Sequence, residues 1–333
     1  MRRGKLRKVC ALLRLCRLAG GLILALALGP AAMAVAEPAT AVLDFPLLAE
    51  PAGGYQSGPI PPNGPQPGGL PPGFVPWGGP MPWSWQLLPN GLVYPADLAS
   101  TKEPRLASQW FYERHAGWTW DTELGARVGL LRYGSDDGER PEGFQLDMEG
   151  AAFPRLSLEH GEDVVSTDYR IGFPFTYGWD QYQVKFGYMH ICSHLGDEYM
   201  LANPDVERIN YVRNCLLLGG SYFYTKDLRV YAESSWAFEE DGGARPWEFQ
   251  FGVEYSPAGP TGFYPKPFFA VNGDIRQEVD YGGNICVETG CQWRGAANHL
   301  FRAGVQYFSG KSDQYQFFKQ YEEKIGLGLW YDF

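Results

Sequence analysis

Along residues 106–333 the chain alternates between apolar and polar positions with a period of two. The clearest stretch, residues 165–175, places on one face Val165, Thr167, Tyr169, Ile171, Phe173 and Phe175. The same alternation recurs in residues 122–130, 144–149, 228–238 and 247–255. Because successive side chains of a β-strand point to opposite faces, each stretch predicts a strand with one apolar and one polar face.

Two all-β architectures accommodate many such strands: a soluble sandwich, whose apolar faces meet, and a transmembrane barrel, whose apolar faces meet lipid. The 15% aromatic content and strands of about ten residues, with charges of both signs on the second face, favour the barrel. The chain also alternates up to its C-terminal Phe333, which resembles the closing strand by which bacterial outer-membrane barrels are recognised for insertion. We therefore predict a transmembrane antiparallel β-barrel of about twelve strands over residues 106–333.

The lengths of the connections predict which end of the barrel faces which compartment. If Phe333 faces the periplasm, connections 295–299, 224–227 and 177–180 are periplasmic, and 194–206 and 309–323 are extracellular. The first three are short and the last two long, as in bacterial outer-membrane barrels. The first strand then falls near residues 107–114.

The N-terminal third has a different composition. Residues 1–36 combine seven basic residues, an apolar run from Leu18 to Leu28 and a small-x-small sequence at Ala34-Val35-Ala36, which predicts a cleaved signal peptide rather than a membrane anchor. Residues 51–95 hold thirteen prolines and ten glycines, a density that excludes helices and central strands. We expect residues 37–105 to form a disordered, Pro/Gly-rich periplasmic tether, with a peptide-docking segment as the alternative.

The charge of the chain excludes one class of partner. The formal net charge is −10, and it becomes −17 when the seven basic residues of 1–36 are removed. A general nucleic-acid-binding protein needs a basic surface, so we expect no nucleic-acid partner. The partners expected instead are outer-membrane lipids and the barrel assembly machinery, and a homo-oligomer stays open.

Residues 188–198 form the densest group of chemically reactive side chains. This run, Tyr-Met-His-Ile-Cys-Ser-His-Leu-Gly-Asp-Glu, holds two of the five histidines. His190 and Cys192 share the apolar, lipid-facing parity near the outer end of their strand. A histidine and a nucleophile two residues apart point the same way and can act as base and nucleophile.

Two family resemblances rest on these residues. The stretch from about residue 89 to Phe333 resembles a bacterial family of unknown function, number 1207, in the segments 102–105 (KEPR), 129–134 (GLLRYG), 150–155 (GAAFPR), 193–198 (SHLGDE) and 328–333 (GLWYDF). The resemblance implies kinship and no reaction. The family's His-x-Ser-Ser-His pattern stands here as His190-Ile191-Cys192-Ser193-His194, with cysteine at the first serine.

The second and weaker resemblance is to outer-membrane phospholipase A and the lipid A deacylases, which carry a lipid-facing His-x-Ser pair. It implies a catalytic set with His190 as general base, Cys192 at the nucleophile position, Ser193 beside it and Asn214 or Asn210 as the orienting residue. The phospholipase pattern continues with Asn-Gly, whereas this chain continues with Ser193-His194. Such a site would cleave an acyl ester of membrane lipid. No motif fixes a cofactor, and calcium is the candidate to test.

Other interpretations of the same residues stay open. His190 and Cys192 fit interfacial packing, and the pair at 197–198 fits a solvated loop. Metal binding by His190 together with His194, Asp197 and Glu198 is a further alternative.

The pairing of the cysteines depends on the strand register. Cys192 and Cys215 would face each other, and form a disulfide, if their hairpin were centred near residues 203–204, whereas another register separates them. On a regular strand, the odd spacing of Cys286 and Cys291 points them to opposite faces.

Inward-facing charges complete the expectation for the barrel. These charges should pair inside a narrow lumen, and they either plug it or leave a small channel. They are Arg127, Asp147, Glu149, Asp168, Arg170, Lys185, Arg229, Glu233, Glu248, Asp274, Arg276 and Arg302. The leading functional hypothesis is a structural or narrow-channel protein of the bacterial outer membrane. Its rival is a lipid acyl hydrolase with a site at His190.

Overall fold

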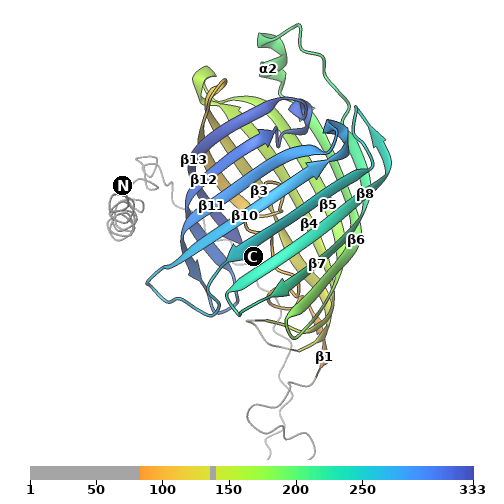
Figure 1. Cartoon of the computed structure of the whole chain (residues 1–333), viewed down its shortest axis with the longest axis vertical. Coiled ribbons are helices and arrows are strands. Elements are labelled where there is room, and N and C mark those ends of the chain that lie inside the picture. Colours follow the sequence, from red (N-terminus) through yellow and green to blue (C-terminus); the bar gives the residue numbers. More distant parts are fainter. Residues whose placement is uncertain (1–82, 136–139) are drawn as a thin grey trace, which may run out of the picture. The chain divides into compact units, whose positions relative to one another are not determined.

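A computed structural model describes residues 83–135 and 140–333. Twelve antiparallel strands, β2 to β13, pair in chain order, and pairing of β13 with β2 and of β3 with β4 closes them into a barrel (Figure 1). An additional short strand, β1, pairs with the far end of β3. The fold is the predicted all-β, transmembrane antiparallel barrel.

The strand bounds match the positions of the alternating stretches. The strands are β1 Ser84–Leu87, β2 Leu106–Glu113, β3 Gly117–Gly134, β4 Gly143–Ser157, β5 Asp163–Trp179, β6 Tyr182–Leu195, β7 Val212–Phe223, β8 Leu228–Asp241, β9 Trp247–Tyr255, β10 Lys266–Arg276, β11 Gly282–Arg294, β12 Leu300–Lys311 and β13 Tyr321–Asp332. One short α-helix, α2 (Asp197–Ala202), lies in the connection between β6 and β7. No helix in the described ranges is long and apolar enough to cross a membrane.

The connections fall at two ends of the barrel. Those at 158–162, 196–211 and 312–320 share the end that carries α2, which we call the α2 end, and those at 180–181, 224–227 and 295–299 share the other, the β1 end (Figure 1). This grouping is the one that the count from Phe333 predicts. The connection at 256–265 is longer than expected for the β1 end.

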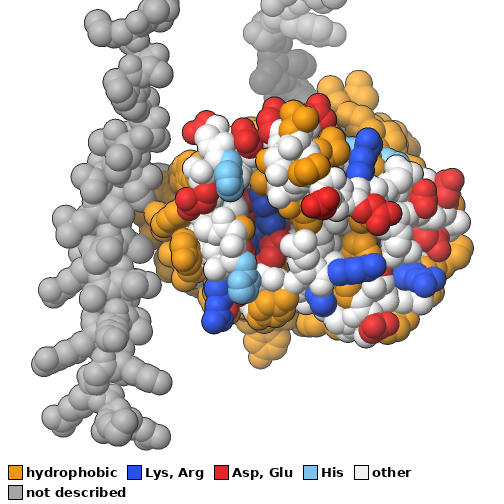
Figure 2. Space-filling model, turned by 90° about the horizontal axis from the view of Figure 1, so that it is seen from above, with side chains coloured by type: hydrophobic (Ala, Val, Ile, Leu, Met, Phe, Trp, Pro, Cys, Tyr) orange, Lys and Arg blue, Asp and Glu red, His pale blue; other side chains and the backbone are white. Residues whose placement is uncertain are grey.

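The two faces of the wall differ in polarity. Large apolar side chains such as Phe173, Phe186 and Phe251 are exposed on the outer face, whereas charged side chains of both signs lie buried inside. Seen from the α2 end, hydrophobic side chains gather around the periphery (Figure 2). An apolar outer face with a polar interior is the pattern of a barrel that spans a membrane.

Aromatic side chains form a belt around the outer face near the β1 end. Trp83 packs edge-on against Tyr133, Phe144 and Tyr177. From Tyr177 the ring contacts continue through Trp179, Tyr182 and Tyr222. Such belts mark the level at which a barrel wall passes from hydrocarbon to water.

Charge pairs fill the interior. Arg127 contacts Asp147 at 2.7 Å, Arg170 contacts Glu149 at 2.6 Å, and both arginines are almost wholly buried. The remaining inward charges named in the sequence are also paired, among them Lys185 with Glu233 and Arg302 with Glu288. A charge removed from water is tolerated when such a partner lies beside it, so the lumen is a network of ion pairs.

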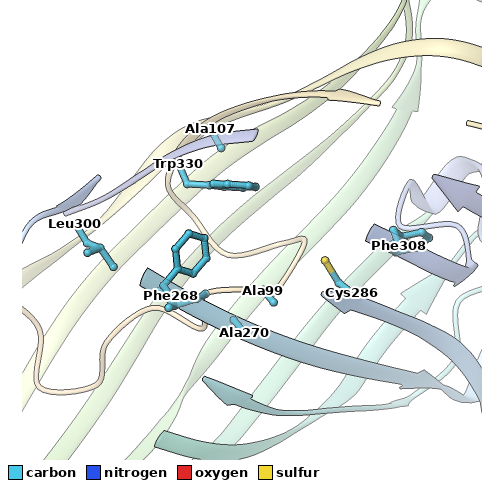
Figure 3. Close-up of a cluster of buried hydrophobic side chains, with 9 residues drawn as sticks. Ala99, Ala107, Phe268, Ala270, Cys286, Leu300, Phe308 and Trp330 are labelled. Carbon is cyan, nitrogen blue, oxygen red and sulfur yellow. The ribbon is translucent and has the colours of Figure 1, made fainter. Parts of the chain in front are cut away.

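Residues 92–105, here the lumen segment, run through this network. Its Asp97 and Lys102 form ion pairs with Arg229 of β8 (2.9 Å) and Asp168 of β5 (2.7 Å). Ala99 belongs to an apolar cluster with Phe268 and other inward side chains (Figure 3). The segment therefore contacts strands on different sides of the barrel.

The structure describes only the C-terminal part of the expected tether and none of the expected signal peptide. The tether was expected to extend to residue 105, but residues 84–87 form β1 and residues 92–105 lie inside the lumen. They stay inside because wall arginines such as Arg229 and Arg302 bind their carboxylates and carbonyl oxygens. The rest of the tether, residues 37–82, and the signal peptide, residues 1–36, lie outside the described residues.

The connection 312–320 folds inward from the α2 end. Asp313 contacts Lys324 at 2.9 Å and Arg155 at 2.7 Å, and Tyr315 donates a hydrogen bond to Glu248. Burial opposes ionisation of Asp313, but Lys324 and Arg155 outweigh it and hold the pKa of its carboxyl well below the usual range. This connection and the lumen segment, together with inward side chains of the wall, line a small polar cavity in the lumen.

Candidate functional site on the outer wall

The two faces of β6 separate the candidate residues. His190, Cys192 and His194 are partly exposed on the outer face, as the alternation predicts, and Met189, Ile191 and Ser193 are buried inside. All lie in the half of β6 nearest the α2 end. The reactive run therefore divides into an outward group and an inward group.

His190 is held by an asparagine on the next strand. His190 and Asn214 are register partners of β6 and β7, and His190 Nδ1 lies 2.9 Å from Asn214 Oδ1. Asn214 Oδ1 also accepts a hydrogen bond from Tyr188 at 2.6 Å, and Asn214 Nδ2 donates to Glu239 at 2.7 Å. We call these four residues, Tyr188, His190, Asn214 and Glu239, the outer-wall network.

The network assigns the protons of His190. Because Asn214 Nδ2 donates to Glu239, its Oδ1 is the acceptor and His190 Nδ1 must carry the proton that reaches it. The neutral ring then keeps a lone pair on Nε2. A histidine in this form can accept a proton from a neighbouring group.

The structure distinguishes the two asparagines considered for the orienting position. Asn214 contacts His190, whereas Asn210 donates to the exposed carboxylate of Asp241. The backbone N–H of Gly242 donates to the same carboxylate. Asn210 therefore belongs to the loop and not to the outer-wall network.

Cys192 lies on the same outward face as His190, two residues closer to the α2 end. Its register partner on β7 is Val212, and Cys215 points into the lumen opposite Met189. The disulfide considered between Cys192 and Cys215 is not present, because the two side chains lie on opposite faces of the wall. Cys286 and Cys291 also occupy opposite faces, as their spacing predicts.

Ser193 is separated from this group. Its hydroxyl faces the lumen and donates to Asp168, and its carbonyl oxygen accepts a hydrogen bond from Gln316 at 2.7 Å. The alternation that brings Cys192 to the outer face thus removes Ser193 from it.

The residues considered for metal binding do not form a cluster. No group of three or more His, Cys, Asp or Glu side chains suited to a metal ion occurs within residues 83–135 and 140–333. His194 packs edge-on against Tyr169, and its Nδ1 lies 3.4 Å from Arg208 Nη2, whereas Asp197 and Glu198 begin helix α2.

Three contacting residues were not identified from the sequence. Tyr188 shares the parity of His190, which is a usable signal, and Arg208 lies in a connection without periodicity. Glu239 has the parity that predicts an inward position, but a bulge between β7 and β8 places Phe238 as an extra residue and brings Glu239 opposite Asn214. A bulge of this kind leaves no clear mark in the alternation.

Together, the apolar outer face, the lumen of ion pairs and the outer-wall network define a transmembrane β-barrel with a polar group on its outer wall. A family model described as a protein of unknown function (DUF1207) matches residues 122–333. The chain belongs to this family. None of the curated proteins compared with it matches.

Solved barrel structures resemble the chain at low identity. Outer membrane phospholipase A from Escherichia coli has a TM-score of 0.48 and 11% identity, over 68% of this chain and 93% of that chain. The Salmonella typhi outer membrane phospholipase dimer with bound calcium has a TM-score of 0.46 and 11% identity, over 68% and 91%. The KdgM porin has a TM-score of 0.39 and 12% identity, over 68% and 99%.

Proposed function

We propose that this protein is an acyl hydrolase of the bacterial outer membrane, which cleaves an ester of membrane lipid at its outer wall. The hydrogen bond from His190 Nδ1 to Asn214 Oδ1, on the outward face beside Cys192, carries this proposal. A polar network on a face otherwise apolar costs free energy in contact with lipid. Such a cost is typical of residues retained for function.

The proposed orientation places the site at the outer rim. Short connections and Phe333 mark the β1 end as periplasmic, so the α2 end faces the exterior. His190 and Cys192 then lie beside the outer leaflet, near its headgroups. An acyl chain lying along Phe186 and Leu218, both exposed on the same face below the network, would bring its ester to Cys192.

The chemistry proceeds by acyl transfer in two steps. His190 Nε2 takes the proton of the Cys192 thiol, the thiolate attacks the ester carbonyl, and the carbon–oxygen bond breaks as His190 returns the proton to the leaving alkoxide. Water, deprotonated by His190, then attacks the thioester. The products are a free fatty acid, a lipid with one acyl chain fewer and the restored thiol. Asn214 keeps the imidazole in the form that accepts a proton.

The experiment is acyl release from phospholipid and lipopolysaccharide by the refolded barrel, with calcium and with chelator. His190→Ala and Cys192→Ala should abolish release, and Cys192→Ser should retain part of it, because serine keeps a nucleophile. His115→Ala, an exposed histidine in the connection 114–116, is the matched control, and Ser193→Ala tests the lumen-facing hydroxyl. Folding is verified by heat-modifiable gel migration.

No release from a correctly folded wild-type barrel would exclude the hydrolase. Release that survives in folded His190→Ala would exclude His190 as the base. Loss of acyl release in Ser193→Ala, with full activity in Cys192→Ala, would assign the nucleophile to the lumen-facing side of β6.

The filled lumen favours a second candidate, a structural barrel that conducts no ions. The lumen segment and the connection 312–320 occupy the interior and pair with its charges. Of the two roles in the leading hypothesis from the sequence, structural or narrow-channel, this arrangement supports the structural one. In a planar bilayer, the structural barrel should show neither single-channel conductance nor acyl release. In either case, we propose assembly into the membrane through the C-terminal strand by the barrel assembly machinery.

A further inference from the structure

We propose that His194 and Arg208 bind the phosphate of a lipid headgroup, so that the lipid cleaved at Cys192 is one that carries a phosphate. This inference rests on the proposed function and names its substrate class. The pair lies at the α2 end of the same outward row that contains His190 and Cys192.

The position of the pair along β6 gives the first argument. Cys192 and His194 are two residues apart on one face, which corresponds to about 7 Å along a strand. His194 is the one nearer the α2 end. A membrane lipid with its acyl chain along the wall and its ester at Cys192 would extend its headgroup in this direction. The glycerol of a phospholipid, or the sugar of lipid A, separates the ester from the phosphate.

The hydrogen-bonding roles of the pair give the second argument. A guanidinium has no acceptor, so Arg208 Nη2 donates to His194 Nδ1 across 3.4 Å. The neutral His194 ring then carries its proton on Nε2 and is a donor there. His190 has the opposite arrangement, with Nδ1 donating to Asn214. One strand face thus holds a histidine that can accept a proton and, four residues on, one that can donate to an anion.

The charge of Arg208 gives the third argument. Arg208 is exposed, and among the described residues no carboxylate lies within ion-pair distance of its guanidinium. Glu239, the acidic residue of the outer-wall network, is bound to Asn214, and Asp241 is bound to Asn210. An arginine without a carboxylate partner, with an imidazole donor beside it, suits a phosphate.

The test compares a lipid that has a phosphate in its headgroup with one that has none. Acyl release is measured from phosphatidylglycerol and from a diacylglycerol with the same chains, in mixed detergent micelles. Arg208→Gln should lower kcat/KM for phosphatidylglycerol about tenfold or more and leave that for diacylglycerol unchanged. Arg245→Gln, an exposed arginine in the connection 242–246 of the same end, is the matched control and should change neither.

A second measurement separates this inference from the proposed function. Native mass spectrometry compares how much phosphatidylglycerol and how much diacylglycerol Cys192→Ala barrels retain. Lipid A and inorganic phosphate are tested as further ligands. Arg208→Gln should reduce retention of both phosphate-bearing lipids, and free phosphate at millimolar concentration should not displace them. Equal retention by Arg208→Gln and Arg245→Gln would overturn the inference, even if the barrel hydrolyses lipid. Displacement of the lipids by free phosphate would overturn the assignment of the bound phosphate to a lipid headgroup. Retention that depends on Arg208 without any hydrolysis would overturn the proposed function and support the headgroup site.

Discussion

The two faces of β6 contain polar groups in opposite situations. Facing the lumen, Lys185 is paired with Glu233 and Ser193 is bound to Asp168, so their side chains are held within the fold. Facing the lipid, His190 is oriented through Nδ1, and the structure gives no hydrogen bond to its Nε2 among the described residues. The inward groups stabilise a closed barrel, whereas the outward His190 keeps one ring nitrogen without a hydrogen bond from the described residues.

The difference shows why a count of reactive side chains misleads in a barrel. Cys192 and Ser193 are neighbours in sequence and chemically similar, yet one faces lipid and the other an ion-pair network. The face of the strand on which a residue lies decides whether its polar group is bound within the lumen or is exposed on the outer wall. Substitutions on the two faces should therefore have different consequences, in stability for the lumen and in activity for the wall.

The largest stability effect should come from a lumen arginine. Arg302 is fully buried, pairs with Glu288 and Asp332 and donates to the carbonyl oxygen of Leu98. Arg302→Ala leaves two buried carboxylates without this partner and should lower the free energy of unfolding by about 3–5 kcal/mol. Urea unfolding in lipid vesicles measures the change. Arg114→Ala removes an exposed pair with Glu323 and should cost about 0.5 kcal/mol. Equal losses for both variants would refute the difference between lumen and surface.

On the outer wall, the effect of Asn214→Ala should appear in turnover instead. Without Asn214 Oδ1, the imidazole of His190 loses the acceptor that fixes its tautomer, and acyl release should fall about 10- to 100-fold. Asn210→Ala removes the neighbouring asparagine that binds Asp241 and should leave the rate unchanged. The comparison is made by steady-state acyl release. A slower Asn210→Ala with a normal Asn214→Ala would reverse the assignment of the orienting residue.

Acid should weaken the inward connection. Because the folded-state pKa of Asp313 is lowered, its stabilisation is present above its unfolded pKa, about 3.9, and is lost as the pH falls toward the folded value. At pH 7, Asp313→Asn should therefore cost about 1–3 kcal/mol. The difference in the free energy of unfolding between Asp313→Asn and the wild type should narrow below pH 4, as measured by urea unfolding at several pH values. A gap that stays constant from pH 7 to pH 3 would contradict this role of the carboxylate.

Apart from the surface control Arg114→Ala, the smallest effect should come from the aromatic belt. Trp83 makes three edge-on ring contacts on the outer face, so Trp83→Ala should lower the free energy of unfolding by about 1 kcal/mol. Brominated lipids locate the belt independently, because the part of the tryptophan quenching that disappears in Trp83→Ala should be strongest with bromine near the headgroups. Strongest quenching at the bilayer centre would move the membrane boundary away from this belt.

Strict alternation made the wall predictable. In a barrel wall, each strand has one face in lipid and one in the lumen, so the face of His190 and of Cys192 follows from parity alone. The even strand number and the grouping of connections followed from the same pattern. The apolar parity of residues 165–175 is the outward face of β5.

The alternation could not predict which residues of neighbouring strands lie opposite each other. The choice between Asn214 and Asn210, and the fate of Cys192 and Cys215, depended on a connection of uncertain length that contains helix α2. The lumen segment was also missed, because it follows a Pro/Gly-rich stretch without strand-like alternation of its own, and its order comes from arginines far away in sequence. Local composition carries no information about partners that only the closed barrel brings near.

The position of the lumen segment has a consequence for how the molecule assembles. Among the described residues, Asp168 of the wall has its ion-pair partner, Lys102, in the segment that precedes the barrel in the chain, and Arg229 binds Asp97 of the same segment in addition to Glu254 of the wall. A wall that closed first would therefore surround a carboxylate without a counterion. Such an intermediate is costly in a medium of low polarity. We therefore expect the segment to become ordered in the same cooperative transition that joins β13 to β2, and no stable empty barrel to accumulate on the way. The rate of this transition should be low, since the contacts that define it join residues more than 130 positions apart in sequence.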